Sequence, residues 1–241
     1  MLTGVGLFLC FANVANSRNI PKDAGCWMLV ITDLQYPAPV FLMVKEGFPF
    51  VIVPAIIALI FGSLQIWIVA VIFVAITLFM AYFFRDPHRD VPDDENVIVS
   101  AADGRVTRVE DNGDGKLVSV FLSPLDVHIN RAPIAGRITK VDYIPGKKIP
   151  ATSDEASLVN ERNAITIQGE KMTVVCTQIA GILARRIVCW NKEGDELKMG
   201  QKYGLIKFSS RTDLLMPREV EIKVSVGDRV TGGETIIARL P

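Results

Sequence analysis

The chain has little of what most metal and nucleotide sites require. Only two histidines are present, and the four cysteines (Cys10, Cys26, Cys176 and Cys189) show no Cys-x-x-Cys spacing. A structural zinc site needs such ligands at close spacing, so the sequence predicts no metal. Neither a glycine-rich phosphate-binding loop nor the Gly-x-Ser-x-Gly turn of a serine hydrolase occurs in the chain.

An excess of charge of one sign is also missing. The chain carries 26 Lys and Arg against 26 Asp and Glu, which gives a formal net charge of zero. Nucleic-acid binding normally needs a basic excess, so we expect no nucleic-acid partner. Cys176 and Cys189 lie in apolar surroundings, and we expect both to be buried thiols in a reducing compartment.

One long stretch, from Phe48 to Phe84, has no charged residue at all. About 20 apolar residues cross a bilayer as a helix, so the stretch is long enough for one tilted span or for a hairpin of two. The weak helix breaker at residues 62–65 (Gly-Ser-Leu-Gln) favours the hairpin. A buried hydrophobic helix of a soluble protein is the alternative interpretation.

Positive residues flank this apolar stretch on both sides: Lys45 precedes it, and Arg85 and Arg89 follow it. Because such residues favour the cytoplasmic side, we expect both ends there, which only a transmembrane or re-entrant hairpin allows. We therefore predict a membrane helical hairpin over residues 45–85 in the cell membrane. The remaining domain, residues 86–241, is then expected on the cytoplasmic face.

Residues 1–44 are expected to form an N-terminal extension of uncertain status. Their apolar patches are interrupted by Asn13, Asp33 and Pro37, and they show no signal-peptide cleavage pattern. Met43 begins a run that leads directly into the apolar stretch, which suggests that the native protein starts there. N-terminal sequencing of native protein tests this hypothesis.

The chain after Arg85 consists of short β-prone runs separated by turn signals. Residues 112–115 read Asn-Gly-Asp-Gly, a strong hairpin signal. Residues 104–110 and 136–142 match each other in residue type at every position, and a looser third copy begins at Gly227. Such repeated strand-turn units predict a compact all-β barrel or sandwich over residues 86–241.

Two segments of this β-rich part carry candidate chemistry. His128 follows a predicted strand in a loop of prolines and polar residues, where a side chain can reach a cleft. Ser209 and Ser210 lie between a β-prone run and a charged triplet. By residue type alone, a lone histidine is more often structural and a Ser-Ser pair is usually a turn. The other histidine, His88, adjoins the end of the apolar stretch and is expected in the membrane interface.

Six short motifs occur in a fixed order along the chain. They are 83–87 (Phe-Phe-Arg-Asp-Pro), 100–104 (Ser-Ala-Ala-Asp-Gly), 126–133 (Asp-Val-His-Ile-Asn-Arg-Ala-Pro), 160–163 (Asn-Glu-Arg-Asn), 179–181 (Ile-Ala-Gly) and 206–213, which contains the Ser-Ser pair. As a set, they resemble the short form of the phosphatidylserine decarboxylase family. The resemblance covers roughly residues 43–241 and rests on the order of the motifs, since no single one is sufficient.

This resemblance implies a self-processing enzyme with a pyruvoyl cofactor. In the family, a serine attacks the preceding peptide carbonyl, and cleavage there leaves a pyruvoyl group that serves as an electron sink. Here the implied bond is Ser209–Ser210, which would give a β subunit ending at 209 and an α subunit of residues 210–241. The implied reaction converts phosphatidylserine to phosphatidylethanolamine and carbon dioxide, and Asp103 and His128 are the implied helpers in orientation and proton transfer.

The chain departs from the family pattern at two positions. Ser209 stands where the family most often has glycine, and Arg131 stands where long-form members have a second histidine. Arg131, Arg162 and Arg211 are expected to meet the phosphate of the lipid. The implied partners are phosphatidylserine in the membrane and the chain's own cleaved α and β subunits, and a homo-oligomer is compatible with this interpretation.

Three alternatives remain open from the sequence. The substrate could be a related ether-linked phosphatidylserine lipid. The chain could instead be a non-enzymatic membrane scaffold, because residues 226–235 resemble the turn-rich strands of biotinyl or lipoyl domains, although a lysine for cofactor attachment is missing. That interpretation leaves Asp103, His128 and Ser210 unexplained. A third alternative is a proenzyme that no longer matures because residue 209 is serine.

Overall fold

The computed structural model describes residues 43–111, 113, 115–147, 149–151, 153, 155–182, 186–208 and 210–241. Residues 1–42, which make up nearly all of the expected N-terminal extension, lie outside the described residues. The start of the native protein at Met43 stays a prediction. Ser209 also lies outside the described residues, whereas Ser210 lies within them.

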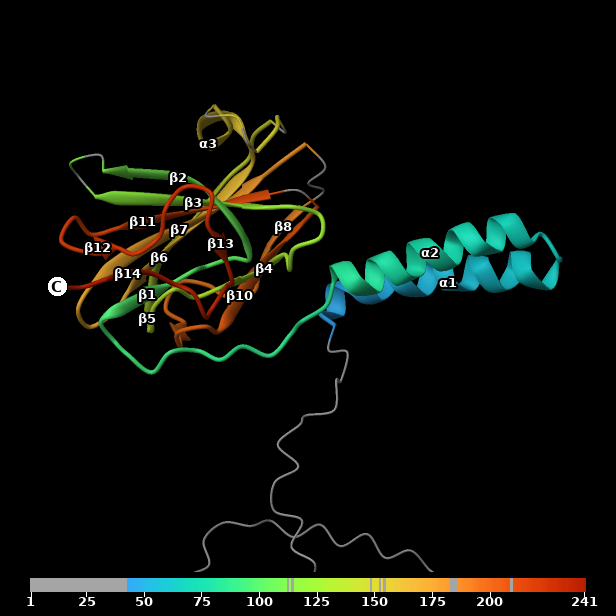
Figure 1. Cartoon of the computed structure of the whole chain (residues 1–241), viewed down its shortest axis with the longest axis horizontal. Helices are drawn as coiled ribbons and strands as arrows, with labels where there is room; N and C mark the ends of the chain where they lie inside the picture. Colours follow the sequence, from blue (N-terminus) through green and yellow to red (C-terminus); the bar gives the residue numbers. More distant parts are fainter. Residues whose placement is uncertain are drawn as a thin grey trace, which may run out of the picture. The chain divides into compact units, whose positions relative to one another are not determined.

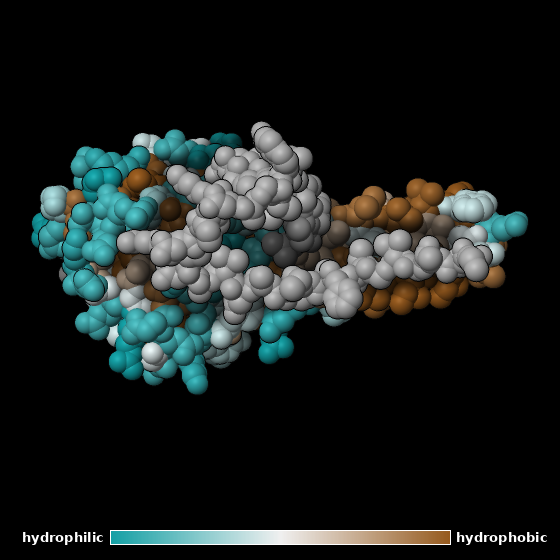
Figure 2. Space-filling view, turned by 90° about the horizontal axis from the view of Figure 1, so that it is seen from below, coloured by the Kyte–Doolittle hydropathy of each residue, from teal (hydrophilic) through white to brown (hydrophobic). Residues whose placement is uncertain are grey.

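The apolar stretch forms two helices joined by a short turn. A 3-10 turn, η1 (Lys45–Gly47), leads into α1 (Phe48–Ser63), and α2 (Trp67–Phe83) follows. Helix α1 ends within the predicted breaker, where Gln65 adopts a positive φ of 60°. Figure 2 shows a largely apolar surface along this helical pair. The helical segment Lys45–Ser63 is long and apolar enough to cross a membrane, which is compatible with membrane association.

The rest of the described chain is mainly β and forms three sheets (Figure 1). An eight-stranded sheet has the order β13-β2-β3-β11-β7-β6-β5-β9, and two three-stranded sheets have the orders β1-β14-β12 and β4-β10-β8. The bounds are β1 (Val97–Val99), β2 (Gly104–Asp111), β3 (Lys116–Leu122), β4 (Ile129–Arg131), β5 (Gly136–Ile144), β6 (Arg162–Gln168), β7 (Thr173–Ala180), β8 (Arg186–Cys189), β9 (Glu196–Leu197), β10 (Lys202–Lys207), β11 (Ser210–Met216), β12 (Glu221–Ile222), β13 (Arg229–Val230) and β14 (Ile236–Arg239), with the short helix α3 (Ala156–Val159) before β6.

The predicted sequence repeat corresponds to a structural repeat of strands β2 and β5. Both strands begin with a glycine at positive φ, 149° at Gly104 and 158° at Gly136. A Cβ at Gly104 would lie 2.1 Å from the Phe121 carbonyl oxygen, and one at Gly136 would lie 2.4 Å from that of Gln168. Only glycine fits such a close approach. The register then shifts at the same step of both strands, after the third residue.

The repeat extends to the strands that flank β2 and β5. The third sequence copy forms β13, which pairs with the start of β2, and β9 pairs with the start of β5 in the same way. Between the smaller sheets, the Val99 N–H donates to the Pro133 carbonyl while the Arg131 N–H donates to the Ala101 carbonyl, at 3.0 and 2.9 Å. The β-rich part is therefore built from two halves with the same backbone pattern.

Two apolar clusters hold these elements together. The larger core lies among the strands, and its fully buried members include Ile138, Ile165 and Ile167. A smaller cluster joins the base of the helical hairpin to β4 and β10 through Phe83, Phe84, Ile129, Leu205 and neighbouring side chains. The Trp190 indole N–H also donates to Glu46 at 2.8 Å. The predicted fold class, a mainly β domain preceded by a helical hairpin, is confirmed.

Candidate active site

His128 lies immediately before strand β4 and is buried, with 1% of its surface exposed. Its ring packs on Phe83 of α2 with the ring centroids 4.3 Å apart. Nδ1 of His128 lies 2.9 Å from the backbone carbonyl oxygen of Asp126. Because a carbonyl oxygen only accepts hydrogen bonds, Nδ1 of a neutral ring must carry the proton in this contact.

Burial also determines the charge of this imidazole. Desolvation lowers the pKa of His128 to about 4, against a smaller opposing effect of the Asp126 carbonyl and carboxylate. The ring is therefore neutral near pH 7, and Nε2 carries a lone pair. Nε2 is buried and has no hydrogen-bond partner in the described part of the chain. A neutral imidazole with a free Nε2 is suited to accept a proton.

Ser210 is the first residue of β11 and is fully buried. Its backbone lies between two strands, in register with Leu122 of β3 and Ala180 of β7. Its Oγ is a second buried polar atom without a hydrogen-bond partner among the residues that the structure describes. Leaving such a group unpaired typically costs about 1–3 kcal/mol, and unpaired groups of this kind often mark functional sites.

A hydrogen bond between Asn130 and Thr212 ties the strand after His128 to the strand of Ser210. The Asn130 amide donates to the Thr212 hydroxyl at 2.8 Å, and both side chains are buried. Side chains two residues apart in a strand lie on the same face. Thr212 is two residues after Ser210, and Asn130 is two residues after His128. The contact therefore holds β4, which His128 directly precedes, against β11, which begins with Ser210.

The same contact is extended by two further buried amides. Gln178 of β7 donates to the Asn130 side-chain oxygen at 2.8 Å, and Asn163 of β6 donates to Gln178 at 3.1 Å. The four polar side chains thus link four strands from two sheets. A fully paired buried network of this kind specifies one packing of the strands.

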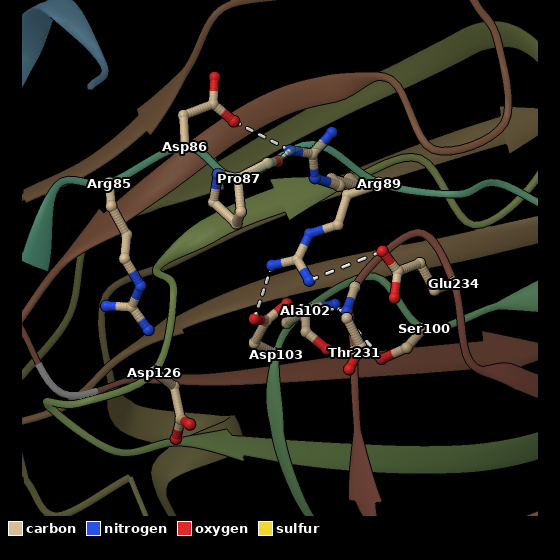
Figure 3. A network of polar contacts seen from close by, with 12 residues as sticks. Arg85, Asp86, Pro87, Arg89, Ser100, Ala102, Asp103, Asp126, Thr231 and Glu234 are labelled. Carbon is tan, nitrogen blue, oxygen red and sulfur yellow. Dashed lines mark hydrogen bonds and ion pairs between the residues drawn. The ribbon is translucent and has the colours of Figure 1, made fainter. Parts of the chain in front are cut away.

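Asp103, the third predicted catalytic residue, belongs to a different set of contacts. Its carboxylate accepts hydrogen bonds from the Arg89 guanidinium at 2.7 Å and from the Gly232 N–H at 2.8 Å. Figure 3 shows Arg89 reaching between Asp103 and Glu234. Burial raises the pKa of Asp103, and Arg89 opposes this shift. Among the described residues, no hydrogen bond or ion pair joins Asp103 to His128 or Ser210.

The three arginines expected at the lipid phosphate all make internal contacts. Arg131 pairs with Asp86 at 2.9 Å and donates to the Gly200 carbonyl. Arg211 pairs with Asp213 at 2.8 Å. Arg162 donates to the Leu158 carbonyl at 2.7 Å. Their predicted role at the phosphate stays a prediction.

Sequence reasoning missed three neighbours of these predicted site residues. Phe83 and Asp126 both lie within the quoted motifs, yet nothing in their spacing shows that they contact the His128 ring and its Nδ1. Arg89 was assigned only to the membrane flank, although its side chain is 9% exposed and pairs with Asp103. The 14-residue separation of this pair gives no local periodicity that could have found it. In contrast, the His88 side chain is 83% exposed.

The remaining candidate ligands are scattered. No group of three or more His, Cys, Asp or Glu side chains that could hold a metal ion occurs in the part of the chain that the structure describes. Cys176 is buried and Cys189 is partly buried, and both are free thiols. Burial raises the pKa of Cys176, so this thiol stays protonated.

Comparisons with known proteins agree with the motifs. The family model for phosphatidylserine decarboxylase matches residues 76–238. A phosphatidylserine decarboxylase proenzyme of Geotalea uraniireducens is 43% identical over 205 residues, which cover 81% of this chain and 95% of that protein. Proenzymes of the same name from Symbiobacterium thermophilum and Burkholderia mallei are 42% and 40% identical, over 88% and 86% of this chain and 100% and 99% of theirs. The chain belongs to the phosphatidylserine decarboxylase family, and the prediction of a decarboxylase is confirmed at this level.

Proposed function

We propose that this chain converts phosphatidylserine to phosphatidylethanolamine and carbon dioxide, after cleaving itself between Ser209 and Ser210. Family membership supports the reaction. The observation that carries the residue assignment is the pair of buried, unpaired atoms, Ser210 Oγ and His128 Nε2. The Asn130–Thr212 hydrogen bond supports this assignment, because it joins the strand that follows His128 to the strand that begins with Ser210.

The chemistry of self-cleavage fits these two side chains. His128 Nε2 accepts the Ser210 hydroxyl proton, and Oγ attacks the carbonyl carbon of residue 209, so that the peptide bond is replaced by an ester. Loss of the Cα proton of residue 210 then breaks the Cβ–O bond and separates the β and α subunits. The resulting dehydroalanine takes up water and releases ammonia, which leaves a pyruvoyl group at position 210.

The Ser210 position also suits a buried carbonyl cofactor. A pyruvoyl group there would supply an electron-withdrawing carbonyl for the carbon that loses carbon dioxide. His128 can take up a proton at Nε2 and deliver it to that carbon after the carboxylate has left. Asp103 remains the proposed orienting carboxylate, and it acts together with Arg89, with which it forms an ion pair. The burial of His128 and Ser210 keeps bulk water from both atoms.

The helical hairpin supports a location at a lipid surface. Anchoring over residues 45–85 would keep the decarboxylase domain beside lipid headgroups, so a two-chain lipid need not be extracted into water. The cations Lys45, Arg85 and Arg89 at the two ends of the hairpin favour the cytoplasmic face. Trypsin treatment of sealed inverted vesicles tests the orientation, since only a cytoplasmic domain is then digested.

A decarboxylation assay with two serine variants tests the proposed function. Purified protein is mixed with phosphatidylserine in detergent micelles, and carbon dioxide release is measured. Ser210→Ala removes the attacking hydroxyl and is expected to lose both chain cleavage and carbon dioxide release. Ser119→Ala is the matched control, because Ser119 lies on the neighbouring strand β3 and its hydroxyl is also buried and unpaired.

The control separates chemistry from packing. Wild-type protein and Ser119→Ala are both expected to cleave and to release carbon dioxide. Cleavage of Ser210→Ala at the same site would show that residue 210 is not the attacking group. Loss of cleavage in Ser119→Ala to the same extent would attribute the effect to strand packing instead.

A further inference from the structure

An apolar groove runs between the two helices of the hairpin, on the half nearer to the β-rich part. Its volume is about 360 Å³, within the range of about 300–1,000 Å³ that small-molecule sites occupy. Its walls come from both helices and contain no charged side chain. The residues that form it include Phe50, Val53, Ile57, Phe73, Ile76 and Met80.

The groove is continuous with the candidate active site through a chain of aromatic rings. Phe50 forms part of the groove wall, and its ring lies 6.2 Å from that of Phe208. Phe208 stacks on Phe83 with the centroids 4.6 Å apart, and Phe83 packs on His128 at 4.3 Å. Phe208 also lies two residues before Ser210. An apolar path of ring contacts therefore connects the groove to the buried imidazole of His128.

A cation lies where this path meets the groove. The Lys207 ammonium group lies 5.3 Å from the centroid of the Phe50 ring. Lys207 is partly buried, and no carboxylate pairs with it among the described residues. A half-buried ammonium group without an anionic partner is suited to hold a phosphate. In contrast, Arg131 and Arg211 already have carboxylate partners.

We infer that the groove holds one acyl chain of the phospholipid substrate, with the phosphate at Lys207 and the serine headgroup at His128 and Ser210. This inference rests on the proposed function. The order of the protein groups, from Ser210 through Lys207 and Phe50 to the groove, matches the order of headgroup, phosphate, glycerol and acyl chain in the lipid. The hydrophobic effect would favour a chain methylene in the groove over one in water.

Filling the groove tests the position of the acyl chain. Ile57→Trp and Ile76→Trp add a bulky ring from either helix. Leu59→Trp is the matched control, because Leu59 lies on α1 outside the groove and is 74% exposed. The probes are dioleoyl- and dihexanoyl-phosphatidylserine in detergent micelles. We expect both groove variants to lower kcat/KM for the dioleoyl lipid about tenfold, with less than a twofold change for the dihexanoyl lipid and for Leu59→Trp.

Removing the cation tests the position of the phosphate. Lys207→Gln is expected to raise KM about tenfold for both lipids, because both carry the same phosphate, while kcat changes less than twofold. Lys198→Gln is the control, since Lys198 is an exposed lysine that does not line the groove. Equal KM values for Lys207→Gln and Lys198→Gln would overturn the assignment of Lys207.

The outcomes distinguish the inference from the function on which it rests. Wild-type protein that releases carbon dioxide from neither lipid would refute the proposed function. Active wild type with groove variants that match Leu59→Trp on both lipids would refute the groove alone, as would an equal loss on both lipids. The same assay is repeated with the phosphatidylserine substrate embedded in phosphatidylcholine vesicles. If the groove variants lose activity in the vesicles but not in micelles, a lipid of the bilayer, and not the substrate, fills the groove.

Discussion

The two halves of the β-rich part share a backbone pattern but carry different side chains. The eight-stranded sheet can be compared from its two edges inward, so that β13, β2, β3 and β11 correspond to β9, β5, β6 and β7. The bulges of β2 and β5 occur at the same step, and their initial glycines face the carbonyls of Phe121 and Gln168. Phe121 therefore corresponds to Gln168.

These correspondences assign a counterpart to each candidate site residue. Phe121 is paired in the sheet with Arg211, and Gln168 is paired with Thr173, so Arg211 corresponds to Thr173. Ser210, which precedes Arg211, therefore corresponds to Met172, which precedes Thr173. The hydrogen bonds from Val99 to Pro133 and from Arg131 to Ala101 make Val99 the counterpart of Arg131. Three residues earlier in the chain in each case, Asn96 is then the counterpart of His128. The aligned glycines 104 and 136 make Ala135 the counterpart of Asp103.

The difference between the halves shows that the fold alone does not produce the site. One half places a hydroxyl, an imidazole and a carboxylate where the other places methionine, asparagine and alanine. Even Asn130 and Thr212, which share a hydrogen bond, have apolar counterparts. These are Ile98 and Val174, and both lie in the apolar core. The chemistry therefore depends on a few side chains added to a repeated scaffold. Exchanging residues between the halves tests this view.

The largest effect is expected from His128→Asn, which gives this position its counterpart's residue. An asparagine amide cannot accept a proton near neutral pH, so we expect self-cleavage to slow about 10²–10⁴-fold. The fraction of cleaved chain is followed by gel electrophoresis. Asn96→His makes the reverse exchange in the other half and is expected to cleave at the wild-type rate. Equal rates for wild type and His128→Asn would contradict the role of the imidazole.

Asp103→Ala is expected to destabilise the fold, since it removes the closer partner of the mostly buried Arg89 and leaves only the ion pair with Glu234 at 3.9 Å. Breaking such a pair costs about 3–5 kcal/mol when the pair is fully buried, and we expect about 2–3 kcal/mol here because the side chains keep some exposure. Urea unfolding measures the loss. The double variant Asp103→Ala with Arg89→Met is expected to recover most of it, and a double variant no more stable than the single one would show that the ion pair is not the cause.

Thr212→Val keeps the shape of the side chain but leaves the Asn130 amide without an acceptor. We expect a loss of about 1–3 kcal/mol in the free energy of unfolding and, if the contact orients His128 toward Ser210, a cleavage rate about tenfold lower. Thr212→Ser restores the hydroxyl and should recover the rate. A valine variant that cleaves at the wild-type rate would show that this contact supports the fold without positioning the reacting groups.

The smallest effect on rate is expected from pH. Because the pKa of folded His128 is about 4, its Nε2 stays unprotonated between pH 7 and pH 5, and the cleavage rate should change less than twofold from this cause. Stability behaves differently. The unfolded chain takes up this proton near pH 6.5, so its uptake favours unfolding progressively as the pH falls from 6.5 to 4. Comparing urea unfolding of wild type and His128→Asn across this range isolates the contribution of His128 to the pH dependence of stability. That contribution includes the interactions of the ring with the nearby charges of Asp126 and Arg85.

Local sequence signals predicted the elements of the fold well. The breaker at residues 62–65 marks the turn of the helical hairpin, and the sequence echo marks β2 and β5. These features depend on neighbouring residues and on strand period, which a single sequence displays. The placement of β11 between β3 and β7 depends on pairing across long separations, and no local pattern encodes it.

The candidate site was predictable only in part for the same reason. The family resemblance indicated Ser210, His128 and Asp103, but not their partners. Asn130 and Thr212 are 82 residues apart, and Arg89 and Asp103 are 14 residues apart. Such contacts become visible only when the strands are assembled. The unpaired state of Ser210 Oγ and His128 Nε2 is likewise a property of the packed structure.

Intact-mass analysis of the purified wild-type chain tests the central claim most directly. We expect two species: one chain that ends at residue 209, and a C-terminal fragment of residues 210–241 whose first residue lacks an amino group and carries a pyruvoyl carbonyl. Reaction with a carbonyl reagent should shift the mass of that fragment alone. An unbroken chain after prolonged incubation, or a fragment that begins at another residue, would contradict the assignment of Ser210.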